Sequence, residues 1–197
     1  MIITVASFKG GVGKTTTSVH LAAYLQNQAP TLLIDGDPNR SASKWAERGG
    51  FPFRVVDERQ GARYARQYEH IVIDTAARPD DADLKSLAAG CDLLVLPTTP
   101  DALALDALVL TVEALQRVGA TNYRILITIA PPKPSRDGED AWALLEGKGY
   151  PLFETIVKRR VAFQKAALAG QLVVAADDPR AELGWDEYLR VGKEIKL

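Results

Sequence analysis

The fold of this chain is decided by residues 9–16, which read Lys9, Gly10, Gly11, Val12, Gly13, Lys14, Thr15 and Thr16. They stand between the β-branched run 2–7 and a helical pattern over 14–27. Glycines let successive backbone N–H groups turn toward phosphate oxygens, and a helix that begins there adds partial positive charge. The sequence therefore predicts a phosphate-binding loop, in which Lys14 neutralises the β and γ phosphates of a nucleotide and Thr15 ligates Mg²⁺.

The loop departs from the strict phosphate-loop pattern, GxxxxGK[ST], at one position. The pattern asks for glycine at position 8, where this chain has Phe8. The other required residues are present, and strand, loop and helix follow one another as the pattern demands. We therefore interpret the segment as a nucleotide-binding loop. The alternative is a glycine-rich turn with an incidental Lys and Thr.

The composition is that of an ordinary globular chain, and its length favours a single domain over residues 1–197. The sequence is 47% hydrophobic and 25% charged, and its 24 Lys and Arg nearly balance its 25 Asp and Glu. Any nucleic-acid site must therefore be a local patch. The lone Cys91 excludes a disulfide framework or a site built from several thiolates of this chain, which is typical of the reducing cytoplasm. The first residues lack a basic targeting region, and no apolar run approaches the roughly 18 residues that span a bilayer, so we expect a soluble, unprocessed protein.

Short apolar runs alternate with longer helical patterns along the chain, which predicts an α/β fold. Strands are expected at 2–7, 31–34, 53–56, 71–73, 93–96 and 124–129, with a weaker one at 153–157. Helices are expected at 14–27, 41–47, 60–67, 81–89, 102–117, 140–146, 161–169 and 179–193. Most of the strand runs are continuously apolar, as strands covered on both faces require. We therefore predict a doubly wound, mostly parallel sheet with helices on both faces.

Two acidic segments follow predicted strands at the edge where the phosphate loop lies. Asp35 and Asp37 come after the run 31–34, and Asp74 closes the run 71–73. Because the carboxyl ends of parallel strands meet at one edge, these carboxylates are expected beside the loop. Phosphoryl transfer needs groups there that order Mg²⁺ and the attacking water. The alternatives are a helix cap for Asp74 and a simple turn for the other pair.

With Lys9 included, the string KGGVGKTT resembles the deviant Walker A motif of the ParA/MinD family of P-loop ATPases. The resemblance implies that Lys9 reaches across a face-to-face homodimer to the partner's ATP, as an arginine finger does. The alternative is a solvated loop lysine. The resemblance also implies that Asp37 activates the attacking water, that Asp74 orders a Mg²⁺-bound water, and that Asp35 helps to order the Mg²⁺ shell or the switch. The catalytic residues are then Lys9, Lys14 and Asp37, and the metal-site residues are Thr15, Asp35 and Asp74.

The resemblance covers nearly the whole chain but includes departures. The loop that contains Pro131 and Pro132 corresponds to the one that packs on adenine in the family. Family members usually carry glutamine where this chain has Asn39, and they carry prolines in the segment that here reads AARP at 76–79. These departures leave the rate of hydrolysis and its coupling open.

A basic cluster in the last quarter of the chain is the candidate DNA site. Its members are Lys158, Arg159, Arg160 and Lys165. The cluster stands where ParA relatives contact DNA, and the alternative is a solvated loop with ordinary charges. The segment 182–197 mixes acidic with basic residues, whereas a membrane-surface helix has a basic polar face. We therefore expect this last helix to pack on its own domain.

The resemblance implies an ATPase of weak intrinsic activity that dimerises with ATP and Mg²⁺, binds nonspecific DNA and positions a cargo such as a plasmid, a chromosome or a carboxysome. It would work in the cytoplasm on the nucleoid, with a ParB-like or cargo-adaptor protein that stimulates hydrolysis and without a membrane. The related iron-protein branch is excluded because one cysteine cannot hold its cluster. Two alternatives stay open: a metabolic P-loop enzyme of the dethiobiotin synthetase kind, which does not need Lys9, and a MinD-like membrane ATPase.

Overall fold

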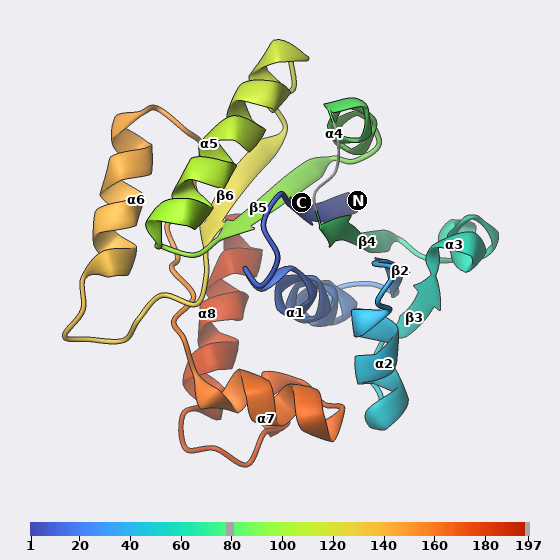
Figure 1. Cartoon of the computed structure of the whole chain (residues 1–197). Helices are drawn as coiled ribbons and strands as arrows, with labels where there is room; N and C mark the ends of the chain where they lie inside the picture. Colours follow the sequence, from blue (N-terminus) through green and yellow to red (C-terminus); the bar gives the residue numbers. More distant parts are fainter. Residues whose placement is uncertain (78–80, 196–197) are drawn as a thin grey trace.

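The computed structural model describes residues 1–77 and 81–195, and within them the strands form one parallel sheet (Figure 1). The strands are β1 (Ile2–Ser7), β2 (Thr31–Gly36), β3 (Arg54–Asp57), β4 (His70–Ala77), β5 (Leu93–Thr98) and β6 (Tyr123–Ile127). Their order across the sheet is β3-β2-β4-β1-β5-β6. The first strand therefore lies in the middle, with the strand that carries Asp74 directly beside it.

Helices cover both faces of this sheet, which confirms the predicted doubly wound α/β fold. They are α1 (Lys14–Gln26), α2 (Ser41–Arg48), α3 (Glu58–Tyr64), α4 (Asp81–Ala89), α5 (Ala102–Arg117), α6 (Asp137–Gly147), α7 (Val161–Ala169) and α8 (Ala181–Glu194), with short 3-10 turns η1 (Ala65–Gln67) and η2 (Val173–Ala175). In Figure 1, α1, α2, α7 and α8 lie below the sheet, α4 and α5 lie above it, and α6 lies to its left.

Each face of the sheet has its own apolar core. In β1, Ile3 and Val5 contact the core beneath α1 and α8, whereas Ala6 belongs to the core beneath α4 and α5. All three side chains are fully buried. This two-sided burial is the reason that the strands read as continuous apolar runs in the sequence.

The prediction of a seventh strand at 153–157 is wrong. The N–H groups of Phe153 and Val157 do donate to β6, to the carbonyls of Ile125 and Ile127, both at 2.9 Å. Between them, however, the N–H groups of residues 154 and 155 donate to the carboxylate of Glu194 at 2.7 and 2.9 Å. Because a side chain of α8 takes these donors, the segment forms only isolated bridges beside β6.

The last helix, α8, packs on its own domain as expected. Tyr188 and Val191 are buried, and Gly192 lies so close to the ring of Tyr24 in α1 that a Cβ atom there would come within 2.4 Å of it. Among the described residues, no helix has both the length and the apolar character to cross a membrane.

Candidate functional site

The loop between β1 and α1 has the backbone that its glycines permit. Gly11 and Gly13 have φ of 80° and 82°, in the left-handed region that favours glycine. The hydroxyl of Thr128, just beyond β6, donates to the carbonyl of Val12 at 2.7 Å and fixes the loop to the sheet. The loop is thus a shaped turn at the N-terminus of α1, where backbone N–H groups and the helix dipole attract anions.

The first turns of α1 hold a carboxylate beside this loop. The hydroxyls of Thr15 and Ser18 donate to the two oxygens of Asp74, at 2.7 and 2.9 Å. Asp74 is fully buried, and the buried Lys14 ammonium lowers its pKa by its charge, although burial outweighs this effect. A threonine hydroxyl next to a carboxylate is a set of hard oxygen donors, which fits Mg²⁺.

Burial raises the pKa of Asp74 to about 6, against the hydrogen bonds from Thr15 and Ser18. The folded chain therefore keeps this proton up to about pH 6, whereas the unfolded chain releases it near pH 4. The carboxyl contributes stability at low pH that is lost as the pH rises between these values. We expect the free energy of unfolding of Asp74→Asn, relative to wild type, to grow by about 3 kcal/mol from pH 4 to above pH 6 and then to level off. Urea denaturation of both nucleotide-free proteins at each pH measures this difference, and a pH-independent difference would contradict the assignment.

The other two predicted acidic residues differ in their surroundings. One oxygen of the buried Asp35 accepts both the N–H and the hydroxyl of Ser43 in α2, each at 2.7 Å, and the other accepts the N–H of Asp37 at 3.2 Å. Asp35 thus ties α2 to the end of β2 and lies beside Asp74 on the neighbouring strand. Asp37 accepts the backbone and side-chain N–H groups of Asn39, at 2.9 and 3.1 Å, and forms the expected turn. Both oxygens of Asp35 are therefore used to hold α2 against the end of β2, whereas among the described residues the carboxylate of Asp37 accepts hydrogen bonds only from Asn39.

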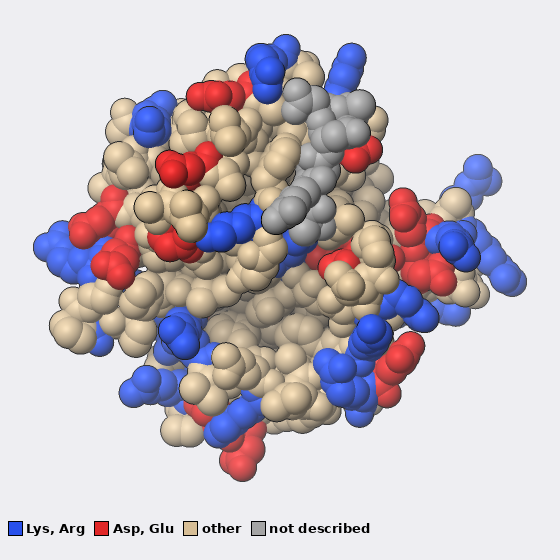
Figure 2. Space-filling view, in the orientation of Figure 1, with Lys and Arg blue, Asp and Glu red and all other residues tan. Residues whose placement is uncertain are grey.

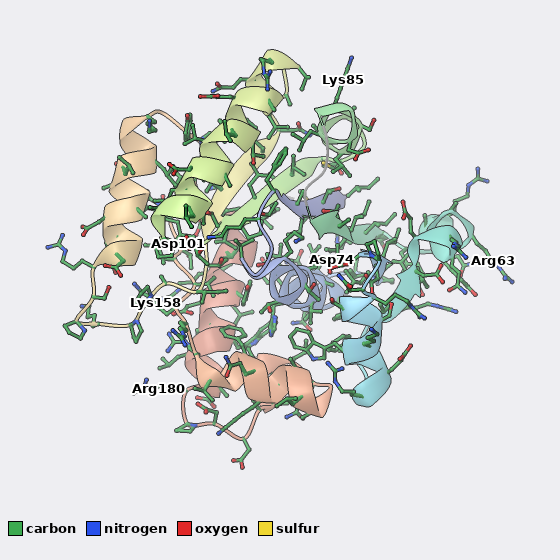
Figure 3. The ribbon with its side chains drawn as sticks, in the orientation of Figure 1. Arg63, Asp74, Lys85, Asp101, Lys158 and Arg180 are labelled. Carbon is green, nitrogen blue, oxygen red and sulfur yellow. The ribbon has the colours of Figure 1, made fainter. Side chains whose placement is uncertain are left out.

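Lys9 extends away from Asp74 toward α5. Its ammonium donates to Asp101 at 2.6 Å, and this carboxylate also caps α5 by accepting the N–H of Ala104 at 3.1 Å. The contact with Lys9, followed by that with Thr99, lowers the pKa of Asp101. Figure 3 shows Asp101 at the start of α5, with Asp74 on the other side of the loop. Lys9 is one-third exposed, so it lies at the open side of the site.

A cavity of about 230 Å³ opens next to the loop, in the hollow at the centre of Figure 2. Its walls come from Gly13, Thr16, Thr128, Ile129, the segment 157–160, Phe163, Gln164, Ala167 and Tyr188. Pro131 and Pro132, the predicted adenine contacts, do not line it. Ile129 takes a left-handed backbone with φ of 52°, and the N–H of Ala130 then donates to the carbonyl of Val157. Of this segment, Thr128 and Ile129 therefore line the cavity, and the adenine contact of the two prolines stays a prediction.

A buried histidine packs behind Thr16 and Tyr188, two of the residues that line this cavity. His20 contacts the carbonyl of Thr16 through Nδ1 at 2.7 Å and accepts the N–H of Val173 through Nε2 at 3.1 Å. Its ring stacks on Tyr188 with centroids 4.8 Å apart. Burial lowers the pKa of His20 to about 4, so the ring is neutral near pH 7 and couples α1 to the segment before α8.

The predicted DNA cluster is not a free basic patch. Lys158 pairs with Glu139 at 2.7 Å, Arg160 pairs with the buried Glu187, and Lys165 pairs with Asp178 at 3.0 Å. Lys158 and Arg160 also line the cavity, together with Arg159. Three of the four charges are thus already matched by carboxylates of the same chain.

Three functional candidates were missed in the sequence. Ser18 could have been found, because it lies one helical turn after Thr15 and so faces the same carboxylate. Thr128 and Asp101 give no local signal, since their partners are more than ninety residues away. Of the segment 76–79 named for its departures, Arg78 and Pro79 lie outside the described residues.

Comparison with known proteins gives matches over the whole of this architecture. Residues 3–173 match the family model described as the CobQ/CobB/MinD/ParA nucleotide binding domain. The chain is 35% identical over 201 residues to "Maintenance of carboxysome distribution protein A" of Gloeobacter kilaueensis, covering 98% of this chain and 93% of that protein.

Two solved structures show the same fold at low identity. A variant of McdA from Cyanothece in complex with ATP has a TM-score of 0.72, 17% identity and coverage of 100% of this chain and 97% of that one. The septum site-determining protein MinD of Pyrococcus horikoshii, in complex with Mg-ADP, has a TM-score of 0.70, 18% identity and coverage of 98% and 94%.

Proposed function

The chain belongs to the CobQ/CobB/MinD/ParA nucleotide-binding family, and we propose that it is a ParA-type ATPase that positions a protein cargo by cycles of ATP binding and hydrolysis. The observation that carries this proposal is the pair of lysines in one phosphate loop. Lys14 is buried at the start of α1, whereas the ammonium of Lys9 lies at the open side, on Asp101. The carboxysome distribution protein of Gloeobacter kilaueensis supports a protein organelle as the class of cargo.

In this proposal the loop binds the phosphates of ATP, and the cavity beside Ile129 takes the base. Thr15 and Asp74 would hold Mg²⁺, with Asp74 acting through a bound water, and the ion would neutralise charge on the transferred phosphoryl group. Asp37 would position the attacking water, because the hydrogen bonds of its carboxylate within the described part of the chain come from Asn39 alone. Lys14 and the backbone N–H groups of the loop keep the phosphates in place.

Lys9 would complete the site of a second protomer in a homodimer. In the single chain its charge is satisfied by Asp101, so it must leave this partner before it can reach another nucleotide. Dimerisation that requires ATP is the central test. Size-exclusion chromatography with ATP and Mg²⁺, with ADP and without nucleotide should give a dimer only with ATP. A monomer in all three conditions would instead favour a metabolic P-loop enzyme, which needs no second lysine.

We expect the Lys9–Asp101 ion pair to affect the ATP concentration that dimerisation requires. Asp101→Asn keeps the cap on α5 but removes the charge that holds Lys9, so dimerisation should need less ATP. The pair is well exposed and contributes little, so the shift in the ATP concentration at half-dimerisation should be no more than about fivefold. Asp106→Asn, on the same helix, is the matched control. An unchanged ATP requirement in Asp101→Asn would remove the restraint on Lys9 from the proposal.

The dimer would bind nonspecific DNA, and a cargo-bound adaptor would stimulate hydrolysis. A single protomer offers few phosphate contacts, and the logarithm of DNA affinity scales with the number of phosphates neutralised. Joining two protomers therefore turns weak binding into measurable binding. A gel-shift assay on unrelated duplexes, with ATP, with ADP and without nucleotide, tests this step, and equal binding in all three states would contradict it.

A further inference from the structure

Two helices at one end of the sheet carry rows of basic residues at helical spacing. Arg40, Lys44 and Arg48 follow one another at intervals of four along α2, beginning at its N-cap. Arg59, Arg63 and Arg66 follow at intervals of four and three along α3 and the turn η1. Side chains three and four residues apart lie on the same face of a helix. Each helix therefore presents three positive charges in a line about 10 to 12 Å long.

The two rows flank the edge strand β3. This strand ends the sheet, and its first residue, Arg54, is also exposed. The guanidinium of Arg54 lies 3.9 Å from the ring centroid of Tyr64, and that of Arg63 lies 5.4 Å from it, so one ring holds both cations. In Figure 2 the blue side chains gather at the right and lower right, over α3 and α2, and Figure 3 shows Arg63 pointing outward. We call the two rows and Arg54 the basic ridge.

The ridge lies in a segment of the chain with an excess of positive charge. Residues 40–67 contain seven Lys and Arg but only three Asp and Glu, in a protein with 24 against 25. All seven cations are exposed. Among the described residues, the ion pairs include only one of them, Arg40 with Glu47 at 3.6 Å. The cluster at 158–165 is the opposite case, because three of its four charges are paired with nearby carboxylates.

The ridge also adjoins the nucleotide site. The N–H of Arg40 donates to the carbonyl of Asp37 at 2.8 Å, so the α2 row begins directly on the turn that holds Asp37. Arg40 and Arg59 share the walls of one open groove with this turn. Asp57 and Glu58 lie in the same groove between the rows, and Asp57 caps α3 by accepting the N–H of Gln60 at 3.0 Å. An anion would therefore bind to the two rows and not to Asp57 and Glu58 between them.

We propose that the basic ridge is the surface on which this protein holds the phosphate backbone of duplex DNA. The inference rests on the proposed DNA-binding function and places it on α2, β3 and α3 instead of on residues 158–165. Exposed cations in rows, of which only Arg40 belongs to an ion pair of the described residues, suit a regular line of phosphates, and no base-specific contact is needed. A membrane surface fits less well, because a helix that binds lipid also inserts large apolar side chains, and residues 40–67 expose none. The contact between Arg40 and the Asp37 turn gives a physical route by which the nucleotide state changes the ridge.

The test compares three variants that each remove positive charge without adding negative charge. The ridge variant combines Arg59→Gln, Arg63→Gln and Arg66→Gln. The control combines Lys85→Gln, Arg136→Gln and Lys148→Gln, which removes three exposed charges elsewhere. The competing-site variant is Lys165→Gln alone. Lys158, Arg159 and Arg160 are spared because they line the cavity that would take the base. ATP-driven dimerisation is measured for each variant, so that loss of folding is not mistaken for loss of binding.

The readout is the affinity of the ATP-bound protein for an unrelated duplex over a range of salt concentrations. We expect the ridge variant to bind DNA at least about tenfold more weakly. The slope of log affinity against log salt concentration should become shallower by about one for each arginine that contacts a phosphate. The DNA affinities of the control and of the competing-site variant should stay within about twofold of the wild-type affinity. The same proteins are also tested on phosphatidylcholine vesicles that contain phosphatidylglycerol.

The possible results distinguish the location of the DNA site from the proposed DNA binding itself. Unchanged DNA binding by the ridge variant, with loss in the competing-site variant, overturns the ridge but leaves the proposed DNA binding intact. Loss of vesicle binding with unchanged DNA binding assigns the ridge to an acidic lipid surface and also overturns the inference. If wild type binds no DNA in any nucleotide state, both the DNA function and the ridge as its site are rejected.

Discussion

Lys14→Ala is expected to remove nucleotide binding while the fold remains. The Lys14 side chain is buried at the first residue of α1, next to the loop whose backbone would surround the phosphates. Removing one member of a buried charge pair costs about 2 to 5 kcal/mol. Affinity for a fluorescent ATP analogue should therefore fall by about 30-fold to several thousand-fold. The loop glycines and the helix dipole would retain only a weak attraction for anions.

A second variant separates the charge of Lys14 from its packing. Lys14→Met keeps an apolar chain of similar length and should lose as much affinity as Lys14→Ala. Lys85→Ala, on the exposed surface of α4, should bind like wild type. Circular dichroism and urea denaturation establish that each variant is folded. Wild-type affinity in Lys14→Ala would overturn the assignment of the phosphate loop.

The sequence was most informative where one short segment determines the structure by itself. The loop at 9–16 and the continuous apolar runs predicted the parallel sheet, because burial on both faces leaves no polar position in strands such as β1. The segment 153–157 is also rich in apolar residues, but it is not a strand. Two of its backbone donors are taken by Glu194, which lies 39 residues beyond Thr155, and a local sequence pattern cannot reveal such a distant contact.

Contacts between distant residues also explain why the basic cluster at 158–165 looks like a free patch in the sequence. Charge density in the sequence does not reveal whether each cation already has a partner, and Lys158 meets a carboxylate from α6 whereas Arg160 meets one from α8. The rows on α2 and α3 were visible in principle as repeats of three and four residues. They are spread over 27 residues, so they do not stand out as a dense run. The structure distinguishes the two sets by pairing and exposure.

Asp37→Ala is expected to bind ATP and form the dimer but to hydrolyse ATP slowly. The variant loses the carboxylate that would position water and keeps Lys14 and the loop that hold the phosphates. A positioned acid or base contributes about 10²- to 10⁴-fold to such a step, so turnover should fall by that factor. Size-exclusion chromatography with ATP and Mg²⁺ should then show a dimer that persists over times in which the wild-type dimer disassembles.

The matched variant Asp37→Asn shows whether the charge or the turn is responsible. The carboxylate of Asp37 accepts two N–H groups of Asn39, and an amide oxygen at the same position can accept both. Asp37→Asn therefore preserves the turn, and with it the bond from Arg40 to the carbonyl of residue 37, but it cannot take a proton from water. Equal loss of hydrolysis in Asp37→Asn and Asp37→Ala identifies the carboxylate as the group that acts on water. Recovery in Asp37→Asn alone would mean that the turn matters and the charge does not. Wild-type turnover in Asp37→Ala would move the role to Asp35 or Asp74, the other two carboxylates at this edge of the sheet.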